Sequence, residues 1–114
     1  MKHRIFTTPF ADVYPLYVAK LERKGRSKKE LHQVIYWLTD HTEAALKKHL
    51  MKKTTFEDFF AAARMNPKSK LITGSVCGVK VQEVTDPLMR KIRYLDKLVD
   101  ELAKGRPLDK VLRS

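Results

Sequence analysis

The segment from Asp86 to Gly105, DPLMRKIRYLDKLVDELAKG, carries the clearest secondary-structure signal in this chain. Asp86 is a favourable N-cap, and Pro87 fits the first helical position, where its missing N–H leaves no bond unmade. Gly105 is a natural stop, and the lysine before it complements the negative end of the helix dipole. The pattern predicts one continuous helix over residues 86–105.

The two faces of this helix differ in kind. The apolar residues fall within an arc of about 140° at a step of about 100° per residue, so they need a partner surface in this chain or in a second copy. They are Leu88, Ile92, Leu95, Leu98, Val99, Leu102 and Ala103. The opposite face carries charges of both signs, and we interpret it as solvated rather than as a DNA-recognition surface. Its members are Arg90, Arg93, Asp96, Lys97, Asp100, Glu101 and Lys104.

Four shorter helices are expected upstream, each with a recognisable start. Asp12 is expected to cap the first, which puts Pro15 at the third helical position, where no backbone hydrogen bond is lost. Capping boxes open the second and the fourth, with Ser27 and Thr54 as N-caps. Thr42 can cap the third. These helices are expected over residues 12–24, 28–39, 43–52 and 55–63.

The segment over residues 73–85 is ambiguous. Cys77, Val79 and Val81 alternate as in a strand, yet Cys77, Val81 and Val84 also step as in a helix. No second strand is evident, and a lone strand cannot pair within a monomer, so we favour a short helix or an irregular turn. A strand here would imply pairing across a dimer.

The fold class that follows is all-α. We expect a single small domain over residues 1–114, built from five to six short helices, with an irregular segment near residues 64–85 that has room for a short strand. The helix over residues 86–105 should pack against the first and second helices.

The charge balance is the main global indication of function. The chain has 24 Lys and Arg against 13 Asp and Glu, a net charge of +11, and such a field attracts polyanions. Ten basic residues form two clusters, which we take as candidate anion-binding or nucleic-acid-binding residues. The first cluster is Lys20, Arg23, Lys24, Arg26, Lys28 and Lys29, and the second is Lys47, Lys48, Lys52 and Lys53. The second cluster's helix lacks the Arg, Asn or Gln that read base edges, so any DNA contact there would be to the backbone.

Metal and catalytic signals are weak. His3, His32, His41, His49 and Cys77 show neither paired-cysteine spacing nor a helical zinc pattern, so no metal and no cofactor is expected. Cys77 is the one candidate nucleophile, but no base is signalled near it, and we interpret it as a buried small hydrophobe at a close helix contact.

The sequence also bears on location. No apolar run approaches the roughly 18–20 residues of a membrane span, and the start MKHRIFTTPF lacks the apolar core of a secretory signal. A single cysteine fits a reducing compartment. A cytoplasmic location and no membrane partner are therefore expected.

Several segments together resemble a known family. They are VYPLYVAKLERKGRSKKEL, VIYWLTD, TTFEDFF, NPKSKLITGSVCGVKVQEV and DPLMRKIRYLDKLVDELAKGRPLDKVLR. The chain resembles the bacterial family catalogued as domain of unknown function twenty-two hundred. The resemblance implies a small, stand-alone cytosolic protein and brings no catalytic residues. The chain departs from that pattern at Asp40-His41, where Gly and an aromatic residue are usual, and at Arg64, where Pro is usual.

Three functions remain open. The first is a non-catalytic binding or regulatory module for an anionic partner, with nucleic acid as one candidate. The alternative is a self-associating protein-interaction domain whose charge serves solubility. The third is an enzyme that uses Cys77. The sequence identifies neither the partner nor the oligomeric state.

Overall fold

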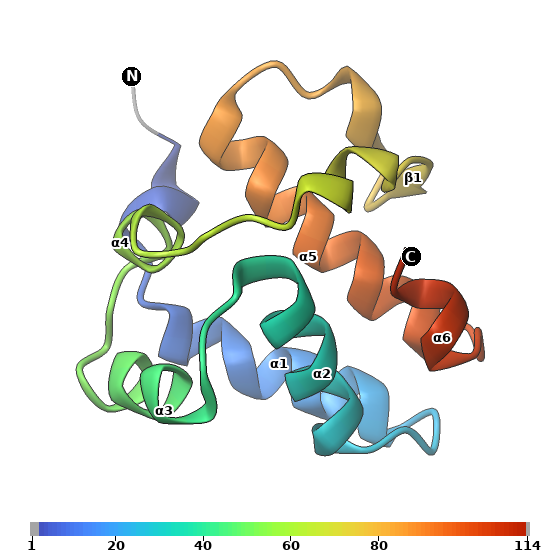
Figure 1. Ribbon diagram of the computed structural model, residues 1–114, viewed down its shortest axis with the longest axis horizontal. Helices are drawn as coiled ribbons and strands as arrows, with labels where there is room; N and C mark the ends of the chain where they lie inside the picture. Colours follow the sequence, from blue (N-terminus) through green and yellow to red (C-terminus); the bar gives the residue numbers. More distant parts are fainter. Residues whose placement is uncertain (1–2, 114) are drawn as a thin grey trace.

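The computed structural model describes residues 3–113 and confirms a small helical domain with a short hairpin. In Figure 1, α5 runs diagonally across the molecule, with α1, α2 and α3 below it in that view. The helices are α1 (Phe10–Glu22), α2 (Lys28–Thr39), α3 (Glu43–Met51), α4 (Phe56–Ala61), α5 (Pro87–Ala103) and α6 (Leu108–Val111). Three 3-10 turns and two strands complete the order: η1 (Arg4–Thr7), η2 (Pro67–Leu71), β1 (Ser75–Val76), β2 (Val79–Lys80) and η3 (Val81–Glu83).

The apolar stripe of α5 forms the centre of the core. As expected, α5 packs against both α1 and α2, and α4 and α6 add to its cover. Leu95, Leu98 and Leu102 are fully buried within the single chain. At about 1.5–3 kcal/mol for each buried leucine side chain, this stripe is a large source of stability. A second copy of the chain is therefore not needed to cover this face.

The first helix begins earlier than the sequence predicts. Its N-cap is Pro9 rather than Asp12, so Pro15 is inside the helix instead of at its third position. A long-range contact explains the shift: Pro9 forms a bridge with Thr55, and the Phe10 amide donates to the Thr54 carbonyl at 2.8 Å. Phe10 is fully buried and stacks on Phe59, with ring centroids 4.2 Å apart. Burial of this aromatic pair offsets the backbone hydrogen bond that Pro15 cannot make.

The expected caps of the next helices are mostly correct. Ser27 and Thr42 each accept a hydrogen bond from the amide three residues on, as does Thr55 at the start of α4. The α4 cap is therefore one residue later than the predicted Thr54. The capping box at Ser27 is only half formed, because the Glu30 carboxylate binds Arg26.

The irregular segment contains a hairpin within the chain, so the expectation of a helix or turn without pairing was wrong. Val76 pairs with Val79, and Ser75 with Lys80, in antiparallel register. Cys77 and Gly78 form the two-residue turn with φ values of 51° and 76°. Positive φ at both positions is the signature of a type I′ turn, which matches the twist of the strands. Because β1 pairs with β2, a strand here does not require a dimer.

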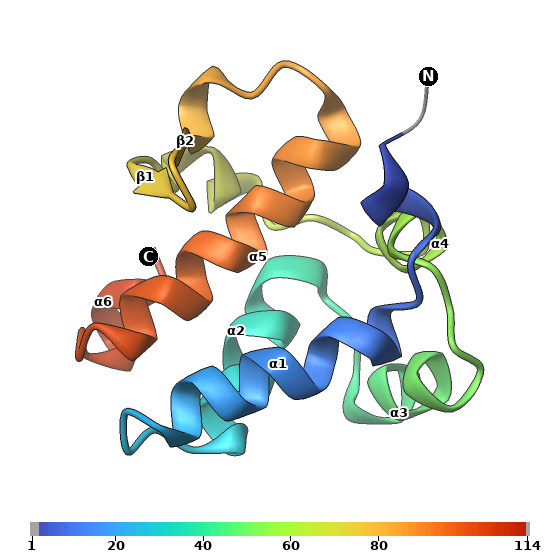
Figure 2. The same cartoon turned by 180° about the vertical axis from the view of Figure 1, so that it is seen from behind.

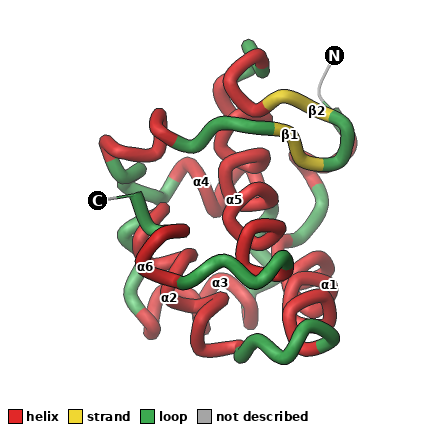
Figure 3. Tube along the Cα trace, turned by 90° about the vertical axis from the view of Figure 1, so that its right-hand side faces the viewer, coloured by secondary structure: helices red, strands yellow, loops and turns green. Residues whose placement is uncertain are grey.

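The hairpin is held against α5. Lys97 Nζ donates to the Ser75 carbonyl at 3.2 Å, and a side chain at Gly74 would meet Lys97 Cε at 3.0 Å. Seen from the back and from the side, α1 and the hairpin lie on either side of α5 (Figures 2 and 3). The charged face of α5 thus lies between two neighbours.

Candidate functional site

The two basic clusters lie at opposite ends of the α1–α2–α3 side of the molecule. The first occupies the end of α1, the turn that follows and the start of α2, and the second occupies α3 and the turn after it. In Figure 1 both lie along the lower edge. Eight of the ten candidate residues are exposed, and only Lys20 and Arg26 are partly buried.

Few of these cations have an acidic partner. Lys20 pairs with Asp100 at 3.3 Å, Arg26 with Glu30 at 2.6 Å, and Lys47 with Glu43 at 3.5 Å. Within residues 3–113 the other members of the two clusters make no ion pair. They are Arg23, Lys24, Lys28, Lys29, Lys48, Lys52 and Lys53.

Aromatic groups lie between the two clusters. The Tyr14 hydroxyl of α1 hydrogen-bonds His32 Nε2 of α2, and the His32 ring lies 6.0 Å from that of Tyr36. The pKa of His32 is lowered, first by burial and then by Lys28, with a further contribution from Lys47. A lysine from each cluster thus acts on the same imidazole. The carboxylate of Glu43, which pairs with Lys47, opposes this lowering.

The outer face of α5 is less solvated than the sequence suggests. Asp96 accepts from the Tyr17 hydroxyl of α1 at 2.6 Å and from Arg93 at 3.2 Å. Burial is the main cause that raises the pKa of Tyr17 well above its usual value, with the Asp96 charge adding to it. Desolvation also raises the pKa of Asp96, although Tyr17 and Arg93 oppose that effect.

Glu101 is a buried carboxylate on the same face. Only 5% of its surface is exposed, and it pairs with Arg113 beyond α6, with Arg106 at 3.3 Å and with Lys97 at 3.9 Å. The expectation that this face is solvated is confirmed for Lys104, which is 70% exposed and pairs with Asp100 at 2.9 Å. For Glu101 it was wrong, because α6 and the hairpin fold over the end of α5.

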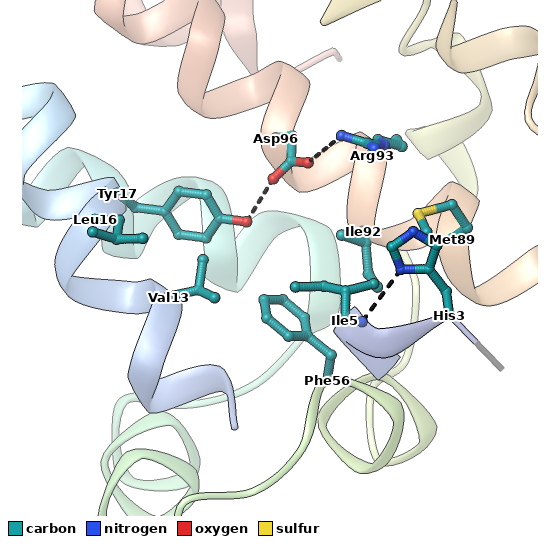
Figure 4. A pocket seen from close by; sticks show the side chains of 10 residues that line it. All are labelled: His3, Ile5, Val13, Leu16, Tyr17, Phe56, Met89, Ile92, Arg93 and Asp96. Carbon is teal, nitrogen blue, oxygen red and sulfur yellow. Dashed lines mark hydrogen bonds and ion pairs between the residues drawn. The ribbon is translucent and has the colours of Figure 1, made fainter. Parts of the chain in front are cut away.

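A cleft opens where η1, α1, α4 and α5 meet (Figure 4). Its volume is about 330 Å³. Its polar end is the Tyr17–Asp96–Arg93 group, and Figure 4 shows the Tyr17 hydroxyl directed across the cleft at Asp96. Its remaining walls are His3, Ile5, Val13, Leu16, Phe56, Met89 and Ile92. No sequence pattern joins these residues, because they come from four separate elements.

Cys77 lies in the exposed turn of the hairpin, so its predicted burial at a helix contact was wrong. In the part of the chain that the structure describes, no base is hydrogen-bonded to its thiol. His41 and His49 instead contact each other, with ring centroids 4.9 Å apart, and both pack on Phe59. Among residues 3–113, no group of three or more His, Cys, Asp or Glu side chains is arranged to hold a metal ion.

The size of the helices also bears on the membrane question. None of those described is both long enough and apolar enough to cross a bilayer.

Comparisons with other proteins agree with the fold. A crystal structure of an uncharacterised protein, SP1917, matches this chain with a TM-score of 0.91 and 43% sequence identity, over 98% of this chain and 93% of that one. No curated protein matches significantly. A family model described as "Uncharacterized protein conserved in bacteria" (DUF2200) matches residues 4–113. With nearly the whole chain matched, this protein belongs to that bacterial family, as the resemblance of its sequence segments implied.

Proposed function

We propose that this protein is a non-catalytic module that binds a polyanionic partner through the two basic clusters. The observation that carries the proposal is a set of exposed cations that have no acidic partner among residues 3–113. They are Arg23, Lys24, Lys28, Lys29, Lys48, Lys52 and Lys53. An unpaired, exposed cation keeps its field in solution, whereas a paired one is largely neutralised. Nucleic acid is the first polyanion to test.

The surroundings of His32 add support. His32 lies on α2 four residues after Lys28 of the first cluster, and its ring contacts Tyr14 of α1 and Tyr36 of α2. Tyr14, His32 and Tyr36 offer partly exposed rings between the two clusters. Aromatic side chains flanked by cations suit a single-stranded nucleic acid, because bases stack on the rings while phosphates meet the lysines.

Self-association has less support. The large apolar side chains that are strongly exposed are Leu16, Met51 and Leu71, and they come from α1, α3 and η2. Apolar residues that are exposed singly are normal on a monomer and do not mark an interface.

The test is binding of labelled mixed-sequence RNA, of DNA and of inorganic polyphosphate, followed by fluorescence anisotropy over a series of salt concentrations. We expect saturable binding at low salt that weakens steeply as salt is added. The double variants Lys28→Gln/Lys29→Gln and Lys48→Gln/Lys52→Gln should each lower the salt slope by about 1–2 units, since each phosphate contact contributes about 0.9 for duplex DNA.

The matched control is Lys68→Gln/Lys70→Gln, which removes the same charge from exposed positions outside both clusters. It should leave the salt slope nearly unchanged. Absence of binding to all three polyanions at low salt would overturn the proposal. Equal weakening by the control would mean that net charge, rather than this surface, attracts the ligand.

A further inference from the structure

We propose that the cleft between η1, α1, α4 and α5 binds a small amphipathic carboxylate, with its apolar body in the cleft and its carboxylate on Arg93. This site is distinct from the basic clusters and does not depend on the polyanion proposal. The cleft volume of about 330 Å³ lies near the lower end of the range of ligand sites, so it suits a compact molecule.

The walls of the cleft favour an apolar body. Six of its lining residues are aliphatic, aromatic or thioether side chains, contributed by all four elements. Leu16, on the rim, is 65% exposed and extends the apolar surface of the cleft outward. Covering such a surface with an apolar ligand releases water from both partners. The six are Ile5, Val13, Leu16, Phe56, Met89 and Ile92.

The polar end of the cleft leaves one group with unmet hydrogen-bonding capacity. Both Asp96 oxygens have a donor, one from the Tyr17 hydroxyl and one from Arg93 Nη1. Within residues 3–113 Arg93 makes only that one hydrogen bond, and 23% of its side chain is exposed, so Nη2 has no acceptor in the described chain while Arg93 lines the cleft. A guanidinium N–H at the end of an apolar cleft makes its strongest hydrogen bond with a charged acceptor. The ligand should therefore bring an acceptor to this guanidinium.

Charge and geometry select a monocarboxylate. With Nη1 bound to Asp96 and Nε buried, Nη2 is the nitrogen left for a ligand, and a carboxylate oxygen gives it a charge-assisted hydrogen bond. The net charge of +11 favours an anion over an amine. Asp96 lies next to Arg93 and would repel a doubly charged phosphate more than a single negative charge. Asp96 and Tyr17 act as positioning residues, because Tyr17 donates to one Asp96 oxygen while the other oxygen holds Arg93 Nη1, which leaves Nη2 for the ligand.

The experiment compares three ligands with the same eight-carbon chain, octanoate, 1-octanol and octylamine, by calorimetric titration into the full chain. We expect octanoate to bind saturably at one site, about tenfold or more tighter than octanol, because only the carboxylate gains charge-assisted hydrogen bonds. Octylamine should bind more weakly than octanol. Equal affinity for octanoate and octanol would mean that the cleft recognises only the apolar chain, and it would overturn the carboxylate assignment.

Variants locate the site. Arg93→Gln should remove the preference for octanoate over octanol, and Arg93→Lys should restore part of it, since the charge returns without the paired donors. Val13→Phe fills the cleft and should weaken both ligands. The matched control is Arg90→Gln, one helical turn away on α5 and outside the cleft lining. It should leave both affinities unchanged.

Three further outcomes bear on the assignment of the site. If octanoate gives no saturable heat with the unaltered chain, the proposal fails whether or not any variant folds. If Lys28→Gln/Lys29→Gln weakens octanoate as much as Arg93→Gln does, the ligand binds the basic surface instead of the cleft. Polyanion binding that persists in Arg93→Gln would show that the basic clusters bind their ligand independently of the cleft.

Discussion

Replacing Glu101 with Gln removes the carboxylate that three cationic side chains share. Arg113 and Lys97 have only 14% and 13% of their side-chain surfaces exposed, and Glu101 has 6%. Arg113 donates from both terminal nitrogens, with the Nη2 bond at 2.8 Å. The glutamine would keep the shape of the side chain but leave this buried group of positive charges without a counter-charge. The α6 turn and the hairpin both depend on that group.

The expected cost follows from the burial of these partners. Removing one partner of a buried ion pair costs about 3–5 kcal/mol. Arg106 keeps 50% of its side chain exposed and can return to water, so we expect the lower end of that range, about 3 kcal/mol. For a domain of this length, such a loss corresponds to a fall in Tm of roughly 10 °C.

The assay is urea unfolding followed by circular dichroism, with Glu83→Gln as a control at an exposed position that makes no ion pair in the described chain. The control should change the free energy of unfolding by less than about 0.5 kcal/mol. A double-mutant cycle with Arg113→Gln should give a coupling of about 1.5–3 kcal/mol. If Glu101→Gln behaves like the control, or if the coupling is absent, the buried cluster does not hold the end of the chain.

Three further changes test other parts of the structure. Burial, followed by the charges of His41, Lys48 and Lys52, lowers the pKa of His49 below its usual 6.5, so its neutral form is favoured in the folded state. That contribution to stability is complete above pH 6.5 and is lost as the pH falls to the folded-state pKa; His49→Gln should therefore flatten the fall of Tm measured on acidification through this window. Cys77→Asn should stabilise the hairpin turn by about 0.5–1 kcal/mol in urea unfolding, because asparagine tolerates positive φ better than cysteine, and no gain would argue against the type I′ turn. Tyr17→Phe should cost about 1.5–3 kcal/mol in the same assay, since Asp96 loses a donor inside the protein, and a neutral result would mean that water replaces the hydroxyl.

Local signals in the sequence predicted the helices well, and long-range contacts account for most of the errors. Asp86, Gly105 and the apolar stripe act within one helix, so the sequence was sufficient to define α5. The early start of α1 depends on a bridge between Pro9 and Thr55, which no local pattern encodes. The hairpin escaped notice because its strands have two residues each, too few for a period-two pattern, and its turn is Cys-Gly rather than Asn-Gly.

The candidate sites were predicted unequally. The basic clusters are visible as runs of charge, but the sequence could not show which cations are neutralised, because Lys20 and Asp100 are far apart in the chain. The cleft was not visible at all, since Ile5, Val13, Phe56 and Arg93 belong to four elements. An arginine on a mixed-charge helix face looks solvated in sequence. Only the folded structure shows that Arg93 Nε is buried without a hydrogen-bond partner among the described residues.

The positions of the acidic residues explain why the excess positive charge is concentrated on one part of the surface. Asp100 and Glu101 on α5 each bind two or more cations, drawn from α1, α5 and the C-terminal segment. Those cations are held by folding and have little field left for a ligand. Lys20 marks the boundary, because it belongs to the first cluster by sequence but is committed to Asp100 by the fold. It should therefore contribute less to polyanion binding than Lys28, and Lys20→Gln should cost stability while leaving the salt slope of binding almost intact. A larger loss of salt slope in Lys20→Gln than in Lys28→Gln would contradict this division between structural and exposed charge.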